Sequence, residues 1–334
     1  MTDQDTTTRA PFTDLPASLL ADVLAQSEIV SSLLLAEIGA AQSNRIAFRN
    51  QLEARGMILR ESDLGVPLPP TTCGTDGSYA IERMLTADLA VAAAVAVEGL
   101  TPPQETRFWP EPRHTVFVSA EPHHEETPTI LRAVMLGREL SLAIEAPHDL
   151  VLLDMTLTLP LIYFNQALNA APTASGLSCA REFLSNCEGY LDAYAGILTA
   201  CRSDHYFAGL PKYSTRREIG DAMGWPGKYD DRGLLSLMLR AGELSKPLRL
   251  AQPEQEWHLN TGRLPDSIQR KVADPIAAII AGLQRVNVFY YKPQSWLPAL
   301  RVEVAGAVAA NPARLASVVQ GIKLQCSTAA MLEP

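Results

Sequence analysis

The order of strand-like and helix-like segments between residues 71 and 153 constrains the fold most. Three extended apolar segments precede one segment with helical apolar spacing, and a fourth extended segment follows it. We expect strands at 71–74 (ending at Asp76-Gly77), 87–97, 115–120 and 149–153, and a helix at 125–146. Strands that alternate with helices in this way predict a mixed α/β fold.

The remaining chain adds helices around this core. Residues 16–56 have helical apolar spacing and predict one or two helices, after which prolines at 67, 69 and 70 open an extended segment. Further helices are expected at 180–202, 231–242, 266–283 and 311–324, and further strands at 206–210, 287–291 and 300–304. We therefore predict an N-terminal helical segment, 1–65, that contacts a second copy or a partner, and a second domain, 66–334, built on the mixed sheet.

The N-terminal region does not resemble a targeting or membrane segment. Its first residues are polar, and the apolar stretch 17–41 carries Asp22, Glu28 and Glu37, so we expect an amphipathic helix and not a membrane span. The five cysteines form no CxxC pair and are odd in number, which favours a reducing compartment. We expect a cytoplasmic protein.

Charge is distributed unevenly along the chain. Residues 1–200 hold 11 Lys and Arg against 25 Asp and Glu, a net charge of −14, whereas residues 201–334 hold 17 against 12, a net charge of +5. The second part could therefore face an anion, although chance asymmetry on solvated surfaces explains the difference as well. If the anion is DNA, the basic residues Arg216, Arg217, Lys228 and Arg232 are the expected phosphate contacts.

Three acids fall where these elements could bring them together. Asp76 lies at the expected end of the first strand, Glu139 on the helix and Asp154 after the fourth strand. Converging carboxylates bind hard divalent cations, which support phosphodiester hydrolysis. Taken singly, each acid has a simpler explanation: a turn residue, a surface helix residue and a strand terminus. Their joint placement favours a metal site.

Five motifs in order resemble the NurA nuclease family. They are TDGS before a small-apolar strand, RELSLA on a helix, LVLLDMTL, GLPKYS and the late pair FYYKP…LRVEV, and the resemblance runs from about residue 70 to the C-terminus. It implies an RNase H-like mixed sheet core with flanking helices, a Mn²⁺-dependent nuclease activity (Mg²⁺ is possible), and work with a hexameric HerA-type ATPase in DNA end resection. It also implies a homodimer.

The resemblance assigns roles to individual residues. Asp76, Glu139 and Asp154 match the metal-binding acids, and Lys212 in GLPKYS matches a basic position at the rim of the catalytic site, where it would touch a phosphate. Arg301 matches the late R-x-E strand and is expected at the DNA, unless it forms only an exposed ion pair with Glu303. Family members commonly continue with a segment carrying a His or Asp that completes the site; this sequence has no such segment after residue 330.

Two other functions remain open on sequence grounds. An actin-like ATPase also uses an Asp-Gly-Ser hairpin, but it needs a second glycine-rich loop, and the sequence after Asp154 is MTLTLPLIYFN. A P-loop is not present either, because Gly227-Lys228 is followed by Tyr229. A nuclease fold kept only to bind and regulate the motor is the second alternative. A metal-dependent cleavage assay separates the three.

Overall fold

The computed structural model describes residues 16–99, 107–202, 204–227 and 229–326. These residues form two compact units, which divide between residues 50 and 51. The predicted boundary at 65/66 therefore lies inside the second unit, because the short strand β1 (Ile58–Arg60) joins the sheet of that unit by pairing with β7 (Glu243–Ser245).

The first unit is dominated by one long helix, α1 (Ala17–Ala54), whose last residues belong to the second unit. Most of its large apolar side chains are not buried: Leu33, Leu34 and Leu35 are all more than half exposed, and large apolar side chains are exposed along the helix from Leu19 to Ile46. The helix contains an 18-residue window of mean hydropathy 1.6, none of it buried, so its length and composition would suffice to cross a membrane. Core helices and signal sequences meet the same criteria.

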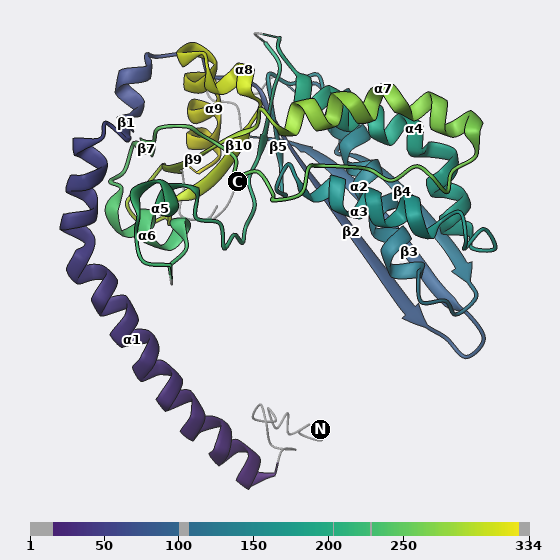
Figure 1. The fold of residues 1–334 in the computed structure, drawn as a ribbon, viewed down its shortest axis with the longest axis horizontal. Helices are drawn as coiled ribbons and strands as arrows, with labels where there is room; N and C mark the ends of the chain where they lie inside the picture. The colour runs from purple at the N-terminus through teal and green to yellow at the C-terminus, as the bar shows by residue number, and fades with distance from the viewer. Residues whose placement is uncertain (1–15, 100–106, 203, 228, 327–334) are drawn as a thin grey trace, which may run out of the picture. The chain divides into compact units, whose positions relative to one another are not determined.

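The second unit is built on one ten-stranded sheet in the order β1-β7-β9-β10-β6-β5-β2-β3-β4, with β8 pairing β9 (Figure 1). The central strands β2, β5 and β6 pair in parallel, whereas the other pairs are antiparallel. The remaining strands are β2 (Thr72–Arg83), β3 (Asp88–Glu98), β4 (Arg113–Glu121), β5 (Leu150–Leu153), β6 (Tyr206–Gly209), β8 (Leu248–Arg249), β9 (Asn287–Lys292) and β10 (Leu300–Val304). This is the mixed α/β fold that the sequence predicted, with one large mixed sheet flanked by helices.

Helices pack against the sheet and form two separate hydrophobic cores with it. The helices are α2 (Thr127–Glu145), α3 (Leu159–Ala170), α4 (Ser178–Thr199), α5 (Glu218–Met223), α6 (Asp231–Met238), α7 (Asp266–Leu283), α8 (Gly306–Ala309) and α9 (Pro312–Gln325), with a 3₁₀ turn at Glu61–Leu64. Strand β5 shows why there are two cores: Val151 and Leu153 face the core of α2, α3, α4 and α7, whereas Leu150 and Leu152 face the core of α9.

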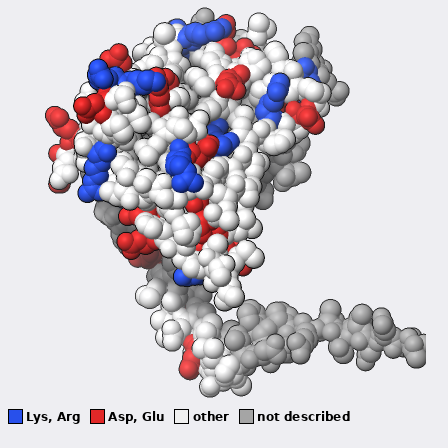
Figure 2. Space-filling model, turned by 90° about the vertical axis from the view of Figure 1, so that its right-hand side faces the viewer, with Lys and Arg blue, Asp and Glu red and all other residues white. Residues whose placement is uncertain are grey.

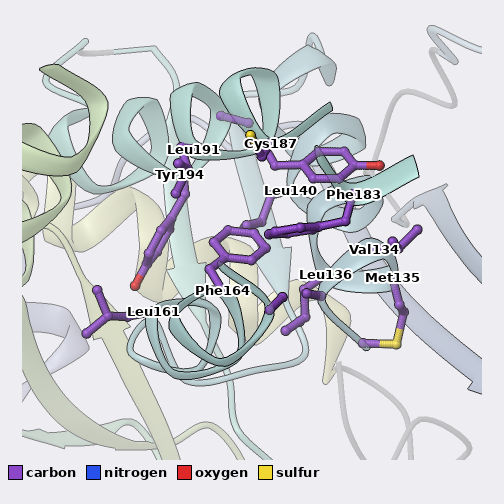
Figure 3. Close-up of a cluster of buried hydrophobic side chains, with 14 of the residues drawn as sticks. Val134, Met135, Leu136, Leu140, Leu161, Phe164, Phe183, Cys187, Leu191 and Tyr194 are labelled. Atoms are coloured by element: carbon purple, nitrogen blue, oxygen red, sulfur yellow. The ribbon is translucent and has the colours of Figure 1, made fainter. Parts of the chain in front are cut away.

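The larger core combines small strand residues with large helix residues. Ala90, Ala92, Ala94 and Ala96 of β3 are buried and point at α2, so the helix can lie close to the sheet. The space between the helices is filled by aromatic rings, of which Phe164, Phe183 and Tyr194 are labelled in Figure 3.

Several elements differ from the predictions, and the short elements β1, β7, β8, α5 and α8 were not predicted. Strand β2 does not end at Asp76-Gly77 but continues to Arg83, because β3 pairs with it along its whole length. Helix α3 was not predicted. Helix α6 ends at Met238 and not at residue 242, and the short strand β7 follows it.

Candidate active site

Two of the predicted acids lie together at a step in the sheet, which is the point where β5 ends and its neighbour β2 continues. The parallel register between β2 and β5 ends at the pair Thr75–Leu153, with the amide of Asp154 3.4 Å from the carbonyl oxygen of Thr75, while β2 continues to Arg83. Asp76 and Asp154 are the next residues of the two strands. They therefore lie side by side at the point where β5 stops.

Glu139 reaches this step from α2. Its side chain is only 3% exposed. Its Oε2 atom lies 2.8 Å from the place where a Cβ on Gly77 would be, so glycine at position 77 leaves the room that the carboxylate occupies. Gly77 thus lies in the middle of a strand, although the sequence suggested a turn there. Its missing side chain leaves room for the Glu139 carboxylate.

The electrostatics of Glu139 connect it with both aspartates. Burial raises the pKa of Glu139 well above its ordinary value, the charges of Asp76 and Asp154 raise it further, and the Thr75 hydroxyl acts in the opposite direction. The Oε1 atom is buried and has no hydrogen-bond partner among the described residues. A buried, unsatisfied carboxylate beside two further acids is the chemistry that a divalent cation would stabilise.

The three carboxylates do not form a complete set of metal ligands in this structure. Within the described ranges, no three His, Cys, Asp or Glu side chains lie close enough to count as a metal cluster. Asp154 instead forms an ion pair with the Lys212 ammonium group. The carboxylate oxygens of the three acids, including the Oε1 atom of Glu139 that has no hydrogen-bond partner among the described residues, fit a divalent cation. The Lys212 ammonium group supplies positive charge beside Asp154.

A surface pocket opens over the two aspartates. Asp76 and Asp154 line it together with Lys212 and Arg232, and its apolar wall includes Val95 and Val97 of β3. Two acids and two bases around one pocket match a site that holds a cation and a phosphate.

The predicted DNA-binding residues have different environments. Besides Lys212 and Arg232 in the pocket, Arg216 is exposed on the loop before α5. Arg217 is engaged within its own loop, where the guanidinium donates to the carbonyl oxygens of Trp225, Pro226 and Tyr229 and to Asp221. These hydrogen bonds brace that loop, and the role of Arg217 in DNA binding stays a prediction. Lys228 lies outside the described residues.

The expectation that Arg301 is exposed and contacts DNA is wrong. Its side chain is fully buried. It donates two hydrogen bonds to Glu218, at 2.7 and 2.8 Å, one to Glu303 at 2.8 Å and one to the Tyr290 hydroxyl at 2.8 Å. A guanidinium that is withdrawn from solvent and holds four hydrogen bonds to protein acceptors cannot reach a phosphate.

Some residues around the site had no sequence signal. Glu218 is a buried acid in α5, a short helix that was not predicted, and Asp231 begins the predicted helix α6, but its burial has no sequence signal. The pair Arg301 and Glu303 was visible in principle, because residues two apart on a strand share a face. Only the tertiary structure shows that this face is buried.

Basic and acidic side chains are interspersed on the face shown in Figure 2, without a continuous basic surface. The net positive charge of the second part of the sequence is therefore not displayed there as one patch. The residues around the pocket, rather than the overall charge balance, identify the expected position of a phosphate.

Comparison with solved structures identifies the fold. No protein-family model and no curated protein sequence matches the chain. The chain is similar to the crystal structure of the NurA nuclease from Sulfolobus solfataricus, with a TM-score of 0.56 and 14% identity over 92% of this chain and 87% of that one. It is also similar to NurA bound to dAMP and manganese, with a TM-score of 0.52 and 11% identity over 83% and 85% of the two chains. The chain has the fold of the NurA nucleases.

Proposed function

We propose that this protein is a metal-dependent DNA nuclease that hydrolyses phosphodiester bonds at the step between β2 and β5. The observation that carries the proposal is the placement of Asp76, Glu139 and Asp154 around that step, with a buried Glu139 oxygen that has no partner in the described structure. The similar structures solved with manganese support Mn²⁺ as the cation, with Mg²⁺ as a second possibility.

The three carboxylates would hold the cation. When bound there, a divalent ion stabilises charge on a phosphate and makes a water molecule more acidic. Lys212 and Arg232 line the same pocket and would hold the phosphate, and the apolar side chains of Val95 and Val97 would limit the access of bulk water. Before a cation binds, the lysine ammonium offsets the charge of Asp154.

The proposed role is DNA end processing or defence against phage, as a 5′–3′ exonuclease, a single-strand endonuclease or both. Because neither a P-loop nor a second glycine-rich phosphate loop is present in the sequence, movement along a duplex requires an external motor. A HerA-type hexameric ATPase is the proposed partner, and a homodimer in the cytoplasm is the proposed form.

One observation favours a second function. The described residues contain no assembled metal cluster, and Asp154 is already paired with Lys212. A catalytically weak scaffold that binds and regulates the motor fits this arrangement.

Digestion of DNA labelled at the 5′ or the 3′ end, with and without Mn²⁺, separates the two functions. A nuclease releases labelled fragments only with the metal, and Asp76→Ala abolishes their release while the circular dichroism spectrum stays unchanged. If the wild-type protein produces no fragments in Mn²⁺ or Mg²⁺, the scaffold function is correct and the nuclease proposal is wrong.

A further inference from the structure

The segment that follows Asp154 is held more tightly than a connection between a strand and a helix requires. Residues 155–158 lead from β5 to α3, and the side chains of Met155 and Leu157 are buried. Both polar groups of the Leu157 backbone are bound by buried side chains. Its amide donates to Oε2 of Glu303 at 2.8 Å, and its carbonyl oxygen accepts from the hydroxyl of Tyr194.

The two side chains come from different elements. Glu303 lies on β10, and Tyr194 lies on α4, where its ring packs edge-on against Phe164 (Figure 3). Both are almost completely buried. Because the two hydrogen bonds hold one residue, Leu157, from separate elements, they fix the position of the segment against both the sheet and the helical layer.

A glycine on β6 leaves the space for this segment. Gly209 pairs with Leu153 of β5 and with Glu303 of β10. A Cβ at position 209 would lie 2.7 Å from the carbonyl oxygen of Met155 and 3.2 Å from the Leu157 side chain. The segment after Asp154 therefore crosses Gly209 in direct contact, and its path tolerates no side chain there.

Arg301 connects Glu303, which holds Leu157, with the side of the pocket that carries Arg232. It donates to Glu303, which holds Leu157, and to both oxygens of Glu218 at the start of α5. Burial by itself would raise the pKa of Glu218, but the hydrogen bonds and the charge of Arg301 hold that pKa below its usual value. The buried Asp231 accepts from the amides of Ile219 and Gly220, and the next residue is Arg232 of the pocket.

We propose that Tyr194, Glu303 and Gly209 are positioning residues that set the Asp154 carboxylate for metal binding, with Arg301 as the buried link to helix α6, which carries Arg232. This inference rests on the proposed nuclease function. None of the four residues needs to touch the substrate. Partners that orient a ligand are worth about 10–100-fold in metal affinity or activity in known metal sites.

Tyr194→Phe tests the inference, because it removes one hydroxyl and retains the ring. Its control is Tyr190→Phe, one helical turn earlier in the same aromatic cluster. The first measurement is the dissociation constant of Mn²⁺ by calorimetry on metal-free protein, and the second is kcat and KM for labelled DNA. We expect Tyr194→Phe to weaken Mn²⁺ binding and to lower kcat by about tenfold each. KM should stay unchanged, because Lys212 and Arg232 are intact, and Tyr190→Phe should behave like the wild type.

Gly209→Ala provides a second test with its own control. A Cβ at Gly306 would also lie 2.7 Å from a backbone carbonyl oxygen, that of Arg285, away from the pocket. Gly209→Ala should weaken Mn²⁺ binding more than Gly306→Ala does when the two variants have equal melting temperatures. Unchanged Mn²⁺ affinity in both Tyr194→Phe and Gly209→Ala, with an active wild type, overturns the inference alone. A wild-type protein that neither binds Mn²⁺ nor cuts DNA overturns the proposed function and the inference with it.

Discussion

At the scale of single residues, the proposed metal-binding role of Glu139 conflicts with the stability of the fold in the absence of metal. Its carboxyl group is buried, its pKa is raised well above the ordinary value by burial and by two neighbouring aspartates, and its Oε1 has no partner in the described structure. A group whose folded pKa is raised stabilises the fold fully only below the unfolded pKa, about 4.3 for glutamate, and this contribution is lost as the pH rises through the folded pKa. The protein without metal should therefore lose stability with rising pH at this residue.

Glu139→Gln should remove this pH dependence and abolish cleavage. In the presence of a chelator we expect the variant to exceed the wild type in free energy of unfolding at pH 8 by on the order of 1–3 kcal/mol, and the difference should shrink towards pH 5. Urea denaturation at the two pH values measures it. Glu145→Gln, at the exposed end of the same helix, is the control and should change neither property. A variant no more stable than the wild type at pH 8 would contradict the assignment.

Gly77 is the second residue with a specific role. An alanine methyl group would lie 2.8 Å from Oε2 of Glu139 and 3.0 Å from Met135, so the carboxylate must move. Gly77→Ala should lower the cleavage rate by about 10–100-fold. Gly189→Ala, on α4 with nothing within 4 Å of the added methyl group, should retain the wild-type rate. Equal rates in labelled-DNA assays of both variants would show that the path of Glu139 beside β2 is not needed.

At the scale of elements, the sequence predicted the order of the core strands and the helix α2, because apolar periodicity is a local signal. It predicted β2 wrongly, since Asp-Gly-Ser favours a turn by local propensity. Pairing with β3 from Cys73 to Arg83 outweighs that preference. Helix α3 was missed because LPLIYFN is short and nearly all apolar, a pattern that does not distinguish strand from helix.

The same distinction applies to the candidate site. Asp76, Glu139 and Asp154 could be selected by their place in the order of strands and helices, because apolar periodicity encodes that order locally, although Asp76 lies inside β2 and not at its end. The burial of Arg301 and the bracing role of Arg217 could not, because a basic residue looks alike in sequence whether it faces DNA or the interior. Their environments depend on contacts between residues far apart in the chain.

The loop after β6 and the first turn of α6 carry the two bases of the pocket, Lys212 and Arg232. If each contacts one phosphate, Lys212→Ala combined with Arg232→Ala should weaken binding of a DNA oligonucleotide and reduce the slope of log affinity against log salt by about 2. Fluorescence anisotropy at several salt concentrations measures the slope. Lys271→Ala, which removes an exposed lysine paired with Glu188 on another part of the surface, should leave the slope unchanged. An unaltered slope in the double variant would place the DNA elsewhere.

At the scale of the whole molecule, the exposed apolar surface of α1 raises the question of which partner covers it. Large apolar side chains are exposed along it from Leu19 to Ile46, including Leu24, Ile29 and Leu35 at 59%, 63% and 69%. An exposed apolar surface of this kind is normally covered by another chain or by lipid. The second compact unit begins at Gln51, whose side chain accepts from the indole of Trp225, and includes the fully buried Leu52. A truncation should therefore keep these two residues.

Deletion of residues 1–50 should separate assembly from catalysis. We expect the full-length chain to sediment as a dimer and the truncated chain as a monomer, because the deletion removes the exposed apolar helix and leaves the sheet and the candidate site intact. Metal-dependent cleavage of short single strands should persist in the truncated protein, since all three acids, Lys212 and Arg232 lie in the second unit. Sedimentation equilibrium and the labelled-DNA assay measure the two properties, and flotation with lipid vesicles is the control for the hydropathy of α1. A truncated protein that remains dimeric places the dimer contact in the second unit, and a full-length protein that floats with vesicles assigns the helix to a membrane.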